Sequence, residues 1–496
     1  MRPPAGSMLT RRQFIRQAAC AAVGTVALTS TVRDLRLMNA VVAQSSINDY
    51  RALVCLFLAG GNDSNNLIIP TLQSEYDDYA AIRTPVLALP LTGGPPNTLV
   101  LPISPLNSDG HSYGLHPACP ELQTLFGEGK LATVFNVGTL VYPMTRAEYQ
   151  GGILKRPPQL FSHSDQVTQW QTSVPDRPPG TGWGGRCGDL LASVQPDAAV
   201  SMAITLAGAN TFETGNFVSS YSVSTSGAIA LTPTSQLTGA RLQALTNILG
   251  APYPNLQAKA YADVAAHSIT TGALLNTAIA PTAAANYWTT TFPGTVVLPT
   301  YPATTFNSSL GPQLRMIARL IEAGARARSS GGFGMKRQIF FCSVGGYDLH
   351  ANQTTVTAGV PIPYRGSHAN LLAEVSQSLY AFQRAMEQIG LSNNVTVFTA
   401  SDFNRTFPCN GQGSDHGWGS HHLVLGGAVQ GRRTYGIWPT LTVNGPDDTS
   451  TGRWIPTTAI DQYFATLASW FGVDNSNLLT VFPNLDRFSG RNLGFV

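Results

Sequence analysis

Aspartates follow three short apolar segments of this chain, close to where each segment ends. The segments are 52–59, 339–344 and 395–400, and the aspartates are Asp63, Asp348 and Asp402. Continuous apolar runs are typical of strands buried on both faces, as in a parallel sheet covered by helices. Ligands bind beyond the carboxyl ends of such strands, where three carboxylates repel one another unless a cation or a shared proton lies between them. The pattern therefore predicts a metal site.

Histidines near the same segment ends extend this set of ligands. His350 follows Asp348 by two residues, and His416, His421 and His422 precede a further apolar run at 423–425. Imidazole and carboxylate together suit Zn, Mn or Fe, whereas oxygen ligands alone would suit Mg or Ca. We expect Asp348, His350 and His421 to bind a divalent metal, Zn or Mn before Mg or Ca, with His416 or His422 as substitutes. Taken singly, each of these residues could instead cap a turn or hydrogen-bond a loop backbone.

The elements around these residues predict an α/β fold with a mixed, mostly parallel central sheet and helices on both faces. A helix at 370–389, with an apolar stripe of period 3.6, separates the apolar runs at 339–344 and 395–400. A right-handed strand–helix–strand crossover places Asp348 and Asp402 at the same end of the sheet. Further helices and strands are predicted at 117–128, 132–137, 166–172 (opened by a possible capping box at 162–165), 198–206, 312–328 and 461–471.

The first 43 residues are predicted to be a twin-arginine signal peptide. Two arginines and a phenylalanine at 11–14 precede a short stretch of small and apolar residues, 18–27, and a signal-peptidase site follows at 41–43. We expect periplasmic or extracellular localisation after passage through the twin-arginine export machinery, and no stable transmembrane segment in the mature chain. An uncleaved membrane anchor is the alternative.

The mature chain, 44–496, is predicted to be one large α/β domain with a Thr-, Ala- and Ser-rich insertion at about 208–305. The whole chain has a formal charge of +3, but residues 1–43 hold six Arg and one Asp. Without them, 24 basic and 26 acidic residues leave a charge of −2. Nothing in this balance indicates a nucleic-acid partner.

Five cysteines remain after the predicted cleavage, with no CxxC spacing, so a cysteine zinc site is not expected. Cys55 and Cys342 fall in predicted core strands. We place Cys119, Cys187 and Cys409 in loops, where two of them could pair in an oxidising compartment.

Several motifs together resemble an exported bacterial family, domain of unknown function 1501. They are the twin-arginine leader and the segments 58–63, 162–165, 345–350, 401–406 and 415–422. The resemblance covers most of the mature chain and is weakest at about 208–305. That family is similar to the alkaline phosphatase and sulfatase superfamily, an α/β sandwich that holds one or two metal ions at its sheet edge.

The resemblance implies roles for individual residues. Asp63 would be a metal ligand from the first strand; Asp348, His350 and a histidine of 416–422 would hold one metal, and Asp402 would complete the other. The family motif usually reads Ser-Glu-Phe-Gly-Arg-Thr where this chain has Asp402 and Asn404, and hydrolytic relatives carry an Asp-His pair there. The second metal site is therefore expected to be incomplete.

The superfamily places its nucleophile at a helix N-terminus, and Ser162 is the positional candidate. A helix N-terminus stabilises a phosphate or sulfate anion, although a plain N-cap serine would look the same in sequence. Arg405 and Arg186 are the candidates for binding the anion. The expected function is metal-dependent hydrolysis of phosphate or sulfate esters, with an anionic small molecule or polymer as substrate.

The sequence is also compatible with two other functions. The chain could be a non-catalytic exported binding or assembly protein on a hydrolase-like scaffold. It could also be a serine esterase with a Gly-x-Asn-Asp block at 60–63, although the Gly-Asp-Ser block of that class and a Gly-x-Ser-x-Gly elbow are both absent.

Overall fold

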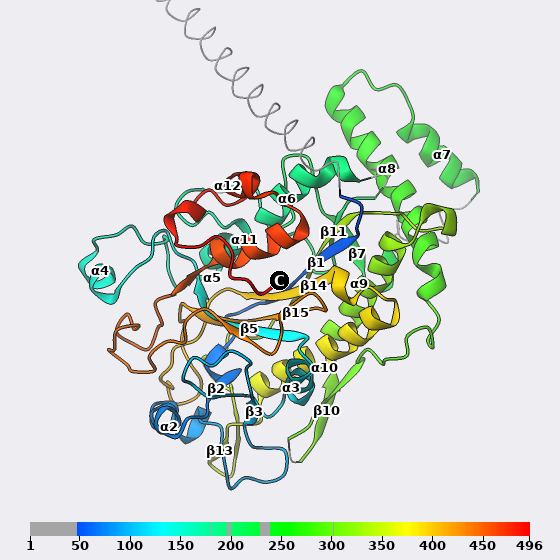
Figure 1. Cartoon of the computed structure of the whole chain (residues 1–496). Helices are drawn as coiled ribbons and strands as arrows, with labels where there is room; N and C mark the ends of the chain where they lie inside the picture. The colour runs from blue at the N-terminus through cyan, green and yellow to red at the C-terminus, as the bar shows by residue number, and fades with distance from the viewer. Residues whose placement is uncertain (1–46, 179, 196–199, 229–238, 301) are drawn as a thin grey trace, which may run out of the picture.

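A ten-stranded mixed sheet forms the centre of the computed structural model, which describes residues 47–178, 180–195, 200–228, 239–300 and 302–496 (Figure 1). The predicted signal peptide lies outside these residues. The strand order is β16-β5-β15-β14-β1-β11-β6-β7-β8, and β17 pairs with β5. The strands are β1 (Arg51–Leu58), β5 (Leu131–Gly138), β6 (Ala203–Thr205), β7 (Tyr221–Ser224), β8 (Gly227–Ala228), β11 (Arg337–Val344), β14 (Val395–Ser401), β15 (Ser420–Leu425), β16 (Thr434–Tyr435) and β17 (Thr458–Ala459).

The three predicted apolar strands are neighbours at the centre of this sheet. β1 pairs in parallel with both β11 and β14, and every residue of β14 and seven of the eight residues of β1 are buried. Leu58 at the end of β1 is in register with Val344 and with Ser401. The carboxyl ends of the three strands therefore meet at one edge, as the crossover predicted. Most pairings of the sheet are parallel, with β15 and β8 as antiparallel exceptions.

Helices cover both faces of the sheet, which confirms the predicted fold class (Figure 1). On one face lie α5 (His163–Thr172), α6 (Trp183–Leu191), α11 (Ile460–Phe471) and α12 (Leu478–Val481). On the other lie α3 (Pro120–Gly127), α9 (Leu310–Ala325) and α10 (Ser367–Gln388). The Trp183 ring on α6 stacks on Phe464 of α11 with centroids 4.5 Å apart, so aromatic packing joins the helices of the first face.

The remaining short strands lie outside the central sheet. They are β2 (Ile68–Pro70), β3 (Leu101–Ile103) and β4 (Tyr113–Leu115) in one small sheet, β9 (Thr295–Leu298) with β10 (Thr304–Asn307), and β12 (Thr355–Thr357) with β13 (Val360–Ile362). The helix α2 (Gln73–Leu87) and the short helix α4 (Arg146–Gly151) complete the body.

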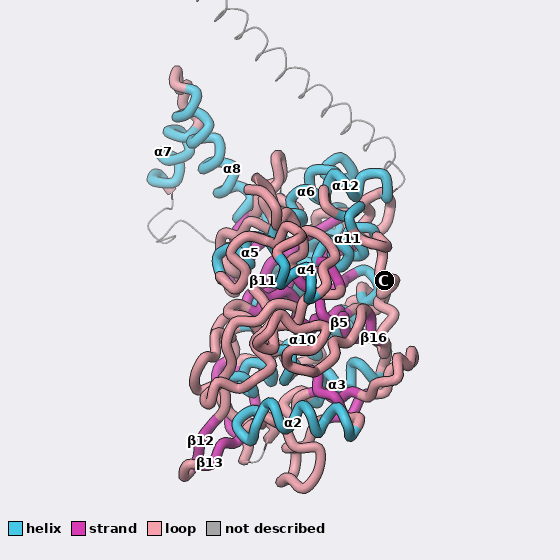
Figure 2. The backbone as a smooth tube through the Cα atoms, turned by 90° about the vertical axis from the view of Figure 1, so that its left-hand side faces the viewer, coloured by secondary structure: helices cyan, strands magenta, loops and turns pink. Residues whose placement is uncertain are grey.

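The insertion at about 208–305 does two things. Its first part adds β7 and β8 beyond β6 and so extends the sheet. In its second part, α7 (Ala240–Leu249) and the N-terminal part of α8 (Leu256–Ile279) project away from the body in both views, while the C-terminal part of α8 packs against it (Figures 1 and 2). The predicted strand at 198–206 is shorter than expected, because β6 comprises only Ala203–Thr205 within the described residues.

The described cysteines are free, which corrects the expectation that two loop cysteines could pair. Cys187 lies inside α6 and Cys119 is the buried N-cap of α3, while Cys409 alone of the three is partly exposed. The buried thiols of Cys119 and Cys187 lie in separate elements. Among the described helices, none combines the length and apolar character that a membrane span requires.

A buried ion pair lies under the edge where β1 ends. Arg83 of α2 pairs with Asp63, and both side chains are almost inaccessible to solvent. Arg83 also donates to the carbonyl oxygens of Thr406 (3.2 Å) and Phe407 (3.0 Å), and Gln353 donates to Asp63. The pair therefore joins α2 to the loops that follow β1, β11 and β14.

Replacing Arg83 with Leu is expected to lower the free energy of unfolding by about 3–5 kcal/mol, because the Asp63 carboxylate would stay buried without its cation. Urea unfolding monitored by tryptophan fluorescence measures this loss. Arg384→Leu is the control, since Arg384 pairs with Glu128 and Glu387 at partly exposed positions and should cost only about 0–1 kcal/mol. Equal losses in the two variants would contradict a structural role for Asp63.

Candidate metal centre

Loops from five elements meet at the carboxyl edge of β1, β11 and β14. The Gly60 N–H donates to Asp402 Oδ1 (2.9 Å), and the Tyr347 N–H donates to the Ala59 carbonyl (3.2 Å). The segment before β15 joins them through the bridge between Arg405 and His416. The N-terminus of α5 adds His163, so residues distant in sequence share one site.

Four side chains converge there and form what we call the Asp348 cluster: Asp348, His163, His350 and His416. The ligand atoms of Asp348, His163 and His416 all lie within 4.8 Å of one another. His350 Nε2 lies 2.9 Å from His416 Nε2 and 3.2 Å from Asp348 Oδ1. The Nε2 atoms of His416 and His163 lie 3.4 and 3.5 Å from the two Asp348 oxygens. The Asp348 side chain is 49% exposed, so the cluster is open to solvent.

Hydrogen bonds determine the tautomer of each histidine in the cluster. The Nδ1 atoms of His163, His350 and His416 contact Asp402 Oδ2 (2.7 Å), Asp415 Oδ1 (3.0 Å) and the Phe161 carbonyl (2.7 Å). Carboxylate and carbonyl oxygens only accept, so each Nδ1 carries the hydrogen and each neutral ring has its lone pair on Nε2.

The lone pairs of His163 and His416 and the Asp348 carboxylate therefore lie close together, and the His350 lone pair lies beside Asp348 and His416. His163 Nε2 is also buried and has no hydrogen-bond partner among the described residues. Lone pairs 2.9 Å apart repel one another unless a cation or a proton lies between them. A metal-binding histidine usually donates its other N–H to a carboxylate or carbonyl, and all three histidines do so here. The residues present thus fit a divalent metal ion.

The surrounding groups shift the pKa values of the cluster residues in different directions. The hydrogen bond to Asp402 raises the pKa of His163, whereas partial burial lowers the pKa of His416. Partial burial raises the pKa of Asp348, but the hydrogen bond and charge of Arg405 outweigh it, and the pKa lies below its usual value. Asp348 is therefore ionised at neutral pH.

Arg405 holds Asp348 in place, and all three of its guanidinium nitrogens donate to protein oxygens. Its side chain is fully buried; Nη1 donates to Asp348 Oδ1 (3.0 Å), and Nε and Nη2 donate to the Ser414 carbonyl (3.2 and 2.6 Å). Gly60 makes room for the same loop: its φ is +116°, and a Cβ there would lie 2.5 Å from the Asp348 nitrogen.

Arg186, the second predicted anion-binding residue, is also occupied. It donates from Nε to the Val481 carbonyl (2.8 Å) and from Nη1 to the Thr181 carbonyl (2.6 Å), and it joins α6 to α12. The structure thus gives both sequence-predicted arginines protein partners.

Asp402 and Ser162 lie next to the cluster. Asp402 is buried and bonds His163 and the Gly60 N–H, so it orients a histidine. Ser162 is the N-cap residue of α5, but its Oγ donates to Asp165 Oδ2 (2.7 Å) and makes no capping bond to the backbone.

The structure does not bring Asp63 and His421 into the cluster. Asp63 is enclosed by Arg83 and Gln353; burial alone would raise its pKa, but Arg83 holds the pKa below its usual value. His421 lies within β15, stacked on Trp438 with centroids 4.6 Å apart, and its Nδ1 accepts from the Asn136 N–H. The strand begins at Ser420, before the predicted start at Leu423, so His421 and His422 point to opposite faces of the sheet and pack in the core.

His163 is the functional residue that sequence reasoning missed. It stands inside the motif 162–165, where the helix N-terminus drew attention to Ser162. A histidine as the first residue of a helix that follows a predicted sheet edge was the signal that could have identified it.

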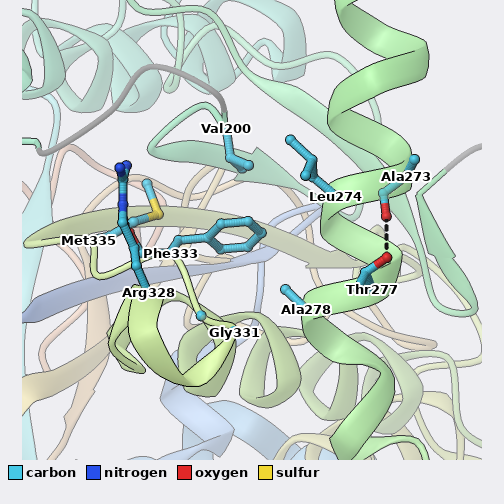
Figure 3. A pocket seen from close by; sticks show the side chains of 10 residues that line it. Val200, Ala273, Leu274, Thr277, Ala278, Arg328, Gly331, Phe333 and Met335 are labelled. Atoms are coloured by element: carbon cyan, nitrogen blue, oxygen red, sulfur yellow. Dashed lines mark hydrogen bonds between the residues drawn. The ribbon is translucent and has the colours of Figure 1, made fainter.

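A separate cavity of about 450 Å³ lies at the opposite end of β11 (Figure 3). Val200, Leu274 and Phe333 point into it, and Met335 precedes the first residue of β11. Since Asp348 follows the last residue of β11, this apolar cavity is distinct from the cluster.

Comparison with known proteins identifies the family. The model described as "Protein of unknown function (DUF1501)" matches residues 50–480, which confirms the resemblance of the motifs. No curated protein matches the chain. Among solved structures, Ps i-CgsB in complex with k-i-k-neocarrahexaose is 9% identical with a TM-score of 0.34, over 89% of this chain and 75% of that one. The PsFucS1 sulfatase from Pseudoalteromonas sp. is 10% identical with a TM-score of 0.28, over 89% and 72%.

The buried histidines predict that stability falls in acid. Burial lowers the pKa of His421 and His422 to about 3 and that of His368 to about 4. Below pH 6.5 the unfolded chain binds protons that the folded chain does not, so stability decreases as the pH falls. His422→Gln should reduce the slope of unfolding free energy between pH 6 and 4 by about 1.4 kcal/mol per pH unit.

Urea unfolding at a series of pH values measures that slope. His267→Gln is the matched control, because His267 lies on the projecting helix α8 and is exposed. A slope in His422→Gln equal to that of the unchanged protein would show that His422 is not neutral when folded.

Proposed function

We infer that this chain, which belongs to the DUF1501 family, is an exported metal-dependent hydrolase of phosphate or sulfate esters. The observation that carries the proposal is the Asp348 cluster, in which three Nε2 lone pairs face one carboxylate. Each histidine already has its Nδ1–H held by an oxygen, as metal-binding histidines do. The proposed ligands are Asp348, His163, His350 and His416.

The donor set suggests the class of metal. Three imidazole nitrogens and one carboxylate favour Zn or Mn over Mg or Ca, which prefer oxygen ligands. A bound divalent ion would supply Lewis-acid polarisation of an ester oxygen and neutralise charge on the anion.

Ser162 is the proposed nucleophile. It is the N-cap residue of α5, directly before the proposed ligand His163, and the Asp165 carboxylate accepts its hydroxyl hydrogen. This hydrogen bond orients Oγ and gives the proton an acceptor within 2.7 Å. The N-cap side chain makes no hydrogen bond to the first N–H groups of this ten-residue helix, and N–H groups at a helix start favour an anion beside them. Arg405 acts by positioning Asp348.

Export is part of the proposal. The twin-arginine motif and small-residue stretch at 1–43 favour a site of action in the periplasm or outside the cell. Fractionation of cells that produce the full chain, with the arginines at 11 and 12 replaced by lysines, would test this step.

The α7–α8 arm favours a second candidate, a non-catalytic binding or assembly role. Leu256, Tyr261 and Val264 on α8 are 83%, 77% and 66% exposed on a segment that projects from the body. Exposed apolar groups of this kind mark interaction surfaces. Metal binding without turnover of any ester would favour this role over hydrolysis.

Metal content tests the cluster directly. Protein purified without chelators or nickel and dialysed against Zn²⁺ or Mn²⁺ should retain metal, as measured by elemental analysis. His350→Ala and His416→Ala should lose it, and Asp402→Asn should weaken binding about 10–100-fold because it only orients His163. His267→Ala, on the distant α8, should retain metal like the unchanged protein. An unchanged protein that takes up no metal would overturn the proposal.

Ser162→Ala separates a nucleophile from a helix cap. Because Ser162 makes no capping bond, the variant should keep its melting temperature and metal content while losing turnover of aryl phosphates, diesters and sulfates. A plain cap would instead cost about 1 kcal/mol of stability. Activity that survives Ser162→Ala would exclude this nucleophile, and activity that survives Asp348→Asn would exclude the site.

A further inference from the structure

The proposed reaction needs a cation that binds the substrate anion, and neither predicted arginine is free to do so. Arg405 donates to Asp348 and Ser414, and Arg186 donates to the backbone carbonyls of Thr181 and Val481. The cluster itself is flanked by the carboxylates of Asp402 and Asp415. An anionic substrate would therefore meet a site whose visible charges are largely negative unless another cation stands at its rim.

Arg453 is such a cation, and two contacts tie it to the cluster. Its Nε donates to the His416 carbonyl (2.7 Å), and its guanidinium carbon lies 4.2 Å from the centroid of the Phe161 ring. His416 is a cluster residue, and Phe161 both accepts the His416 Nδ1–H and precedes Ser162. Arg453 thus lies against the two segments that carry the proposed ligand and the proposed nucleophile.

The surrounding backbone holds this arginine firmly. Its own N–H donates to Asp448 Oδ1 (2.9 Å), and its carbonyl accepts from the Thr449 N–H (3.1 Å). The next residue, Trp454, is buried and donates from its indole nitrogen to Asn65 Oδ1 (3.0 Å). The position of the guanidinium is therefore set by the fold.

The terminal nitrogens of Arg453 are unused. Within the described part of the chain, Nη1 and Nη2 have no protein acceptor, and the side chain is only half-buried. Two parallel N–H groups of a guanidinium fit two oxygens of a phosphate or sulfate group. The aromatic ring beneath adds a cation–π contact that keeps the planar group in place.

We propose that Arg453 binds the anionic group of the substrate beside the Asp348 cluster. This inference rests on the proposed function and deepens it, because it assigns the recognition of the phosphate or sulfate group to a residue that the motifs do not contain. The two arginines have different roles: Arg405 positions the proposed ligand Asp348, and Arg453 binds the anionic group of the substrate.

Inorganic phosphate and inorganic sulfate are the probes, titrated calorimetrically into the Zn²⁺- or Mn²⁺-loaded full chain. Arg453→Gln should weaken binding of the preferred anion about 10–100-fold, as expected for lost charge-assisted hydrogen bonds. Arg453→Lys should recover part of the affinity, because it keeps the charge without the planar fork. Comparison of the two probes shows which anion the site prefers.

Arg156→Gln is the matched control. Arg156 is exposed and its guanidinium lies 4.9 Å from the Tyr149 ring centroid, so it has the same chemistry without contact to the cluster. Its loss should leave the affinity within about twofold, a change below 0.5 kcal/mol. Equal effects of Arg156→Gln and Arg453→Gln would show that anion affinity depends on the overall surface charge and not on Arg453, and would overturn the assignment.

Failure of this inference differs from failure of the proposed function. If the protein takes up metal and Arg453→Gln binds phosphate and sulfate like the unchanged protein, the assignment of Arg453 is overturned while the metal site stands. If no metal is taken up, the proposed function fails, and the titrations are repeated on the metal-free protein. Loss of anion binding in Arg453→Gln would then still support the assignment. The assignment would be overturned if Arg453→Gln bound the anion as tightly as the unchanged protein, or if the unchanged protein bound no anion. Melting temperatures and metal content of each variant show whether it is folded.

Discussion

The parallel register of β14, β1 and β11 is the constraint on which the site depends. Leu58 is level with Val344 and Ser401, so the three chains leave the sheet at the same height. Asp402 follows its strand by one residue and Asp348 by four, and the sharp turn at Gly60 lets the second loop pass close to the first. A slip of one residue in either pairing would turn every side chain of a strand to the other face and separate these carboxylates.

Buried charges make that edge rigid. Arg83 and Arg405 are both fully buried, and each joins a carboxylate to backbone carbonyls of neighbouring loops. In a low-dielectric surrounding such groups are costly to leave unpaired, so the loops cannot separate without exposing a charge. As a consequence, both guanidinium groups are buried and bonded to protein oxygens.

The sequence predicted the central sheet well because long apolar runs report burial on both faces, which only a central strand provides. It placed Asp348 and Asp402 at one edge because a crossover helix at 370–389 makes the strands before and after it parallel, so that both strands end at the same edge. It predicted His421 as a ligand because the apolar run begins at Leu423, whereas the strand begins at Ser420 and includes both histidines. The contact of His163 with Asp402 joins residues 239 positions apart, and no local pattern encodes such a distance.

Two histidines of the cluster, His163 and His416, differ in what accepts their Nδ1–H, and their pKa values shift in opposite directions. A buried carboxylate holds His163 and raises its pKa, while a neutral carbonyl holds His416, whose pKa is lowered by burial. Phe161 supplies that carbonyl from a left-handed backbone conformation, φ +72°, which costs about 1–3 kcal/mol for a residue other than glycine. Strain of this kind persists only where the surrounding structure imposes it. Here the Phe161 carbonyl holds His416, the Phe161 ring lies under Arg453, and the next residue begins α5. Phe161 therefore connects His416, Arg453 and the N-terminus of α5.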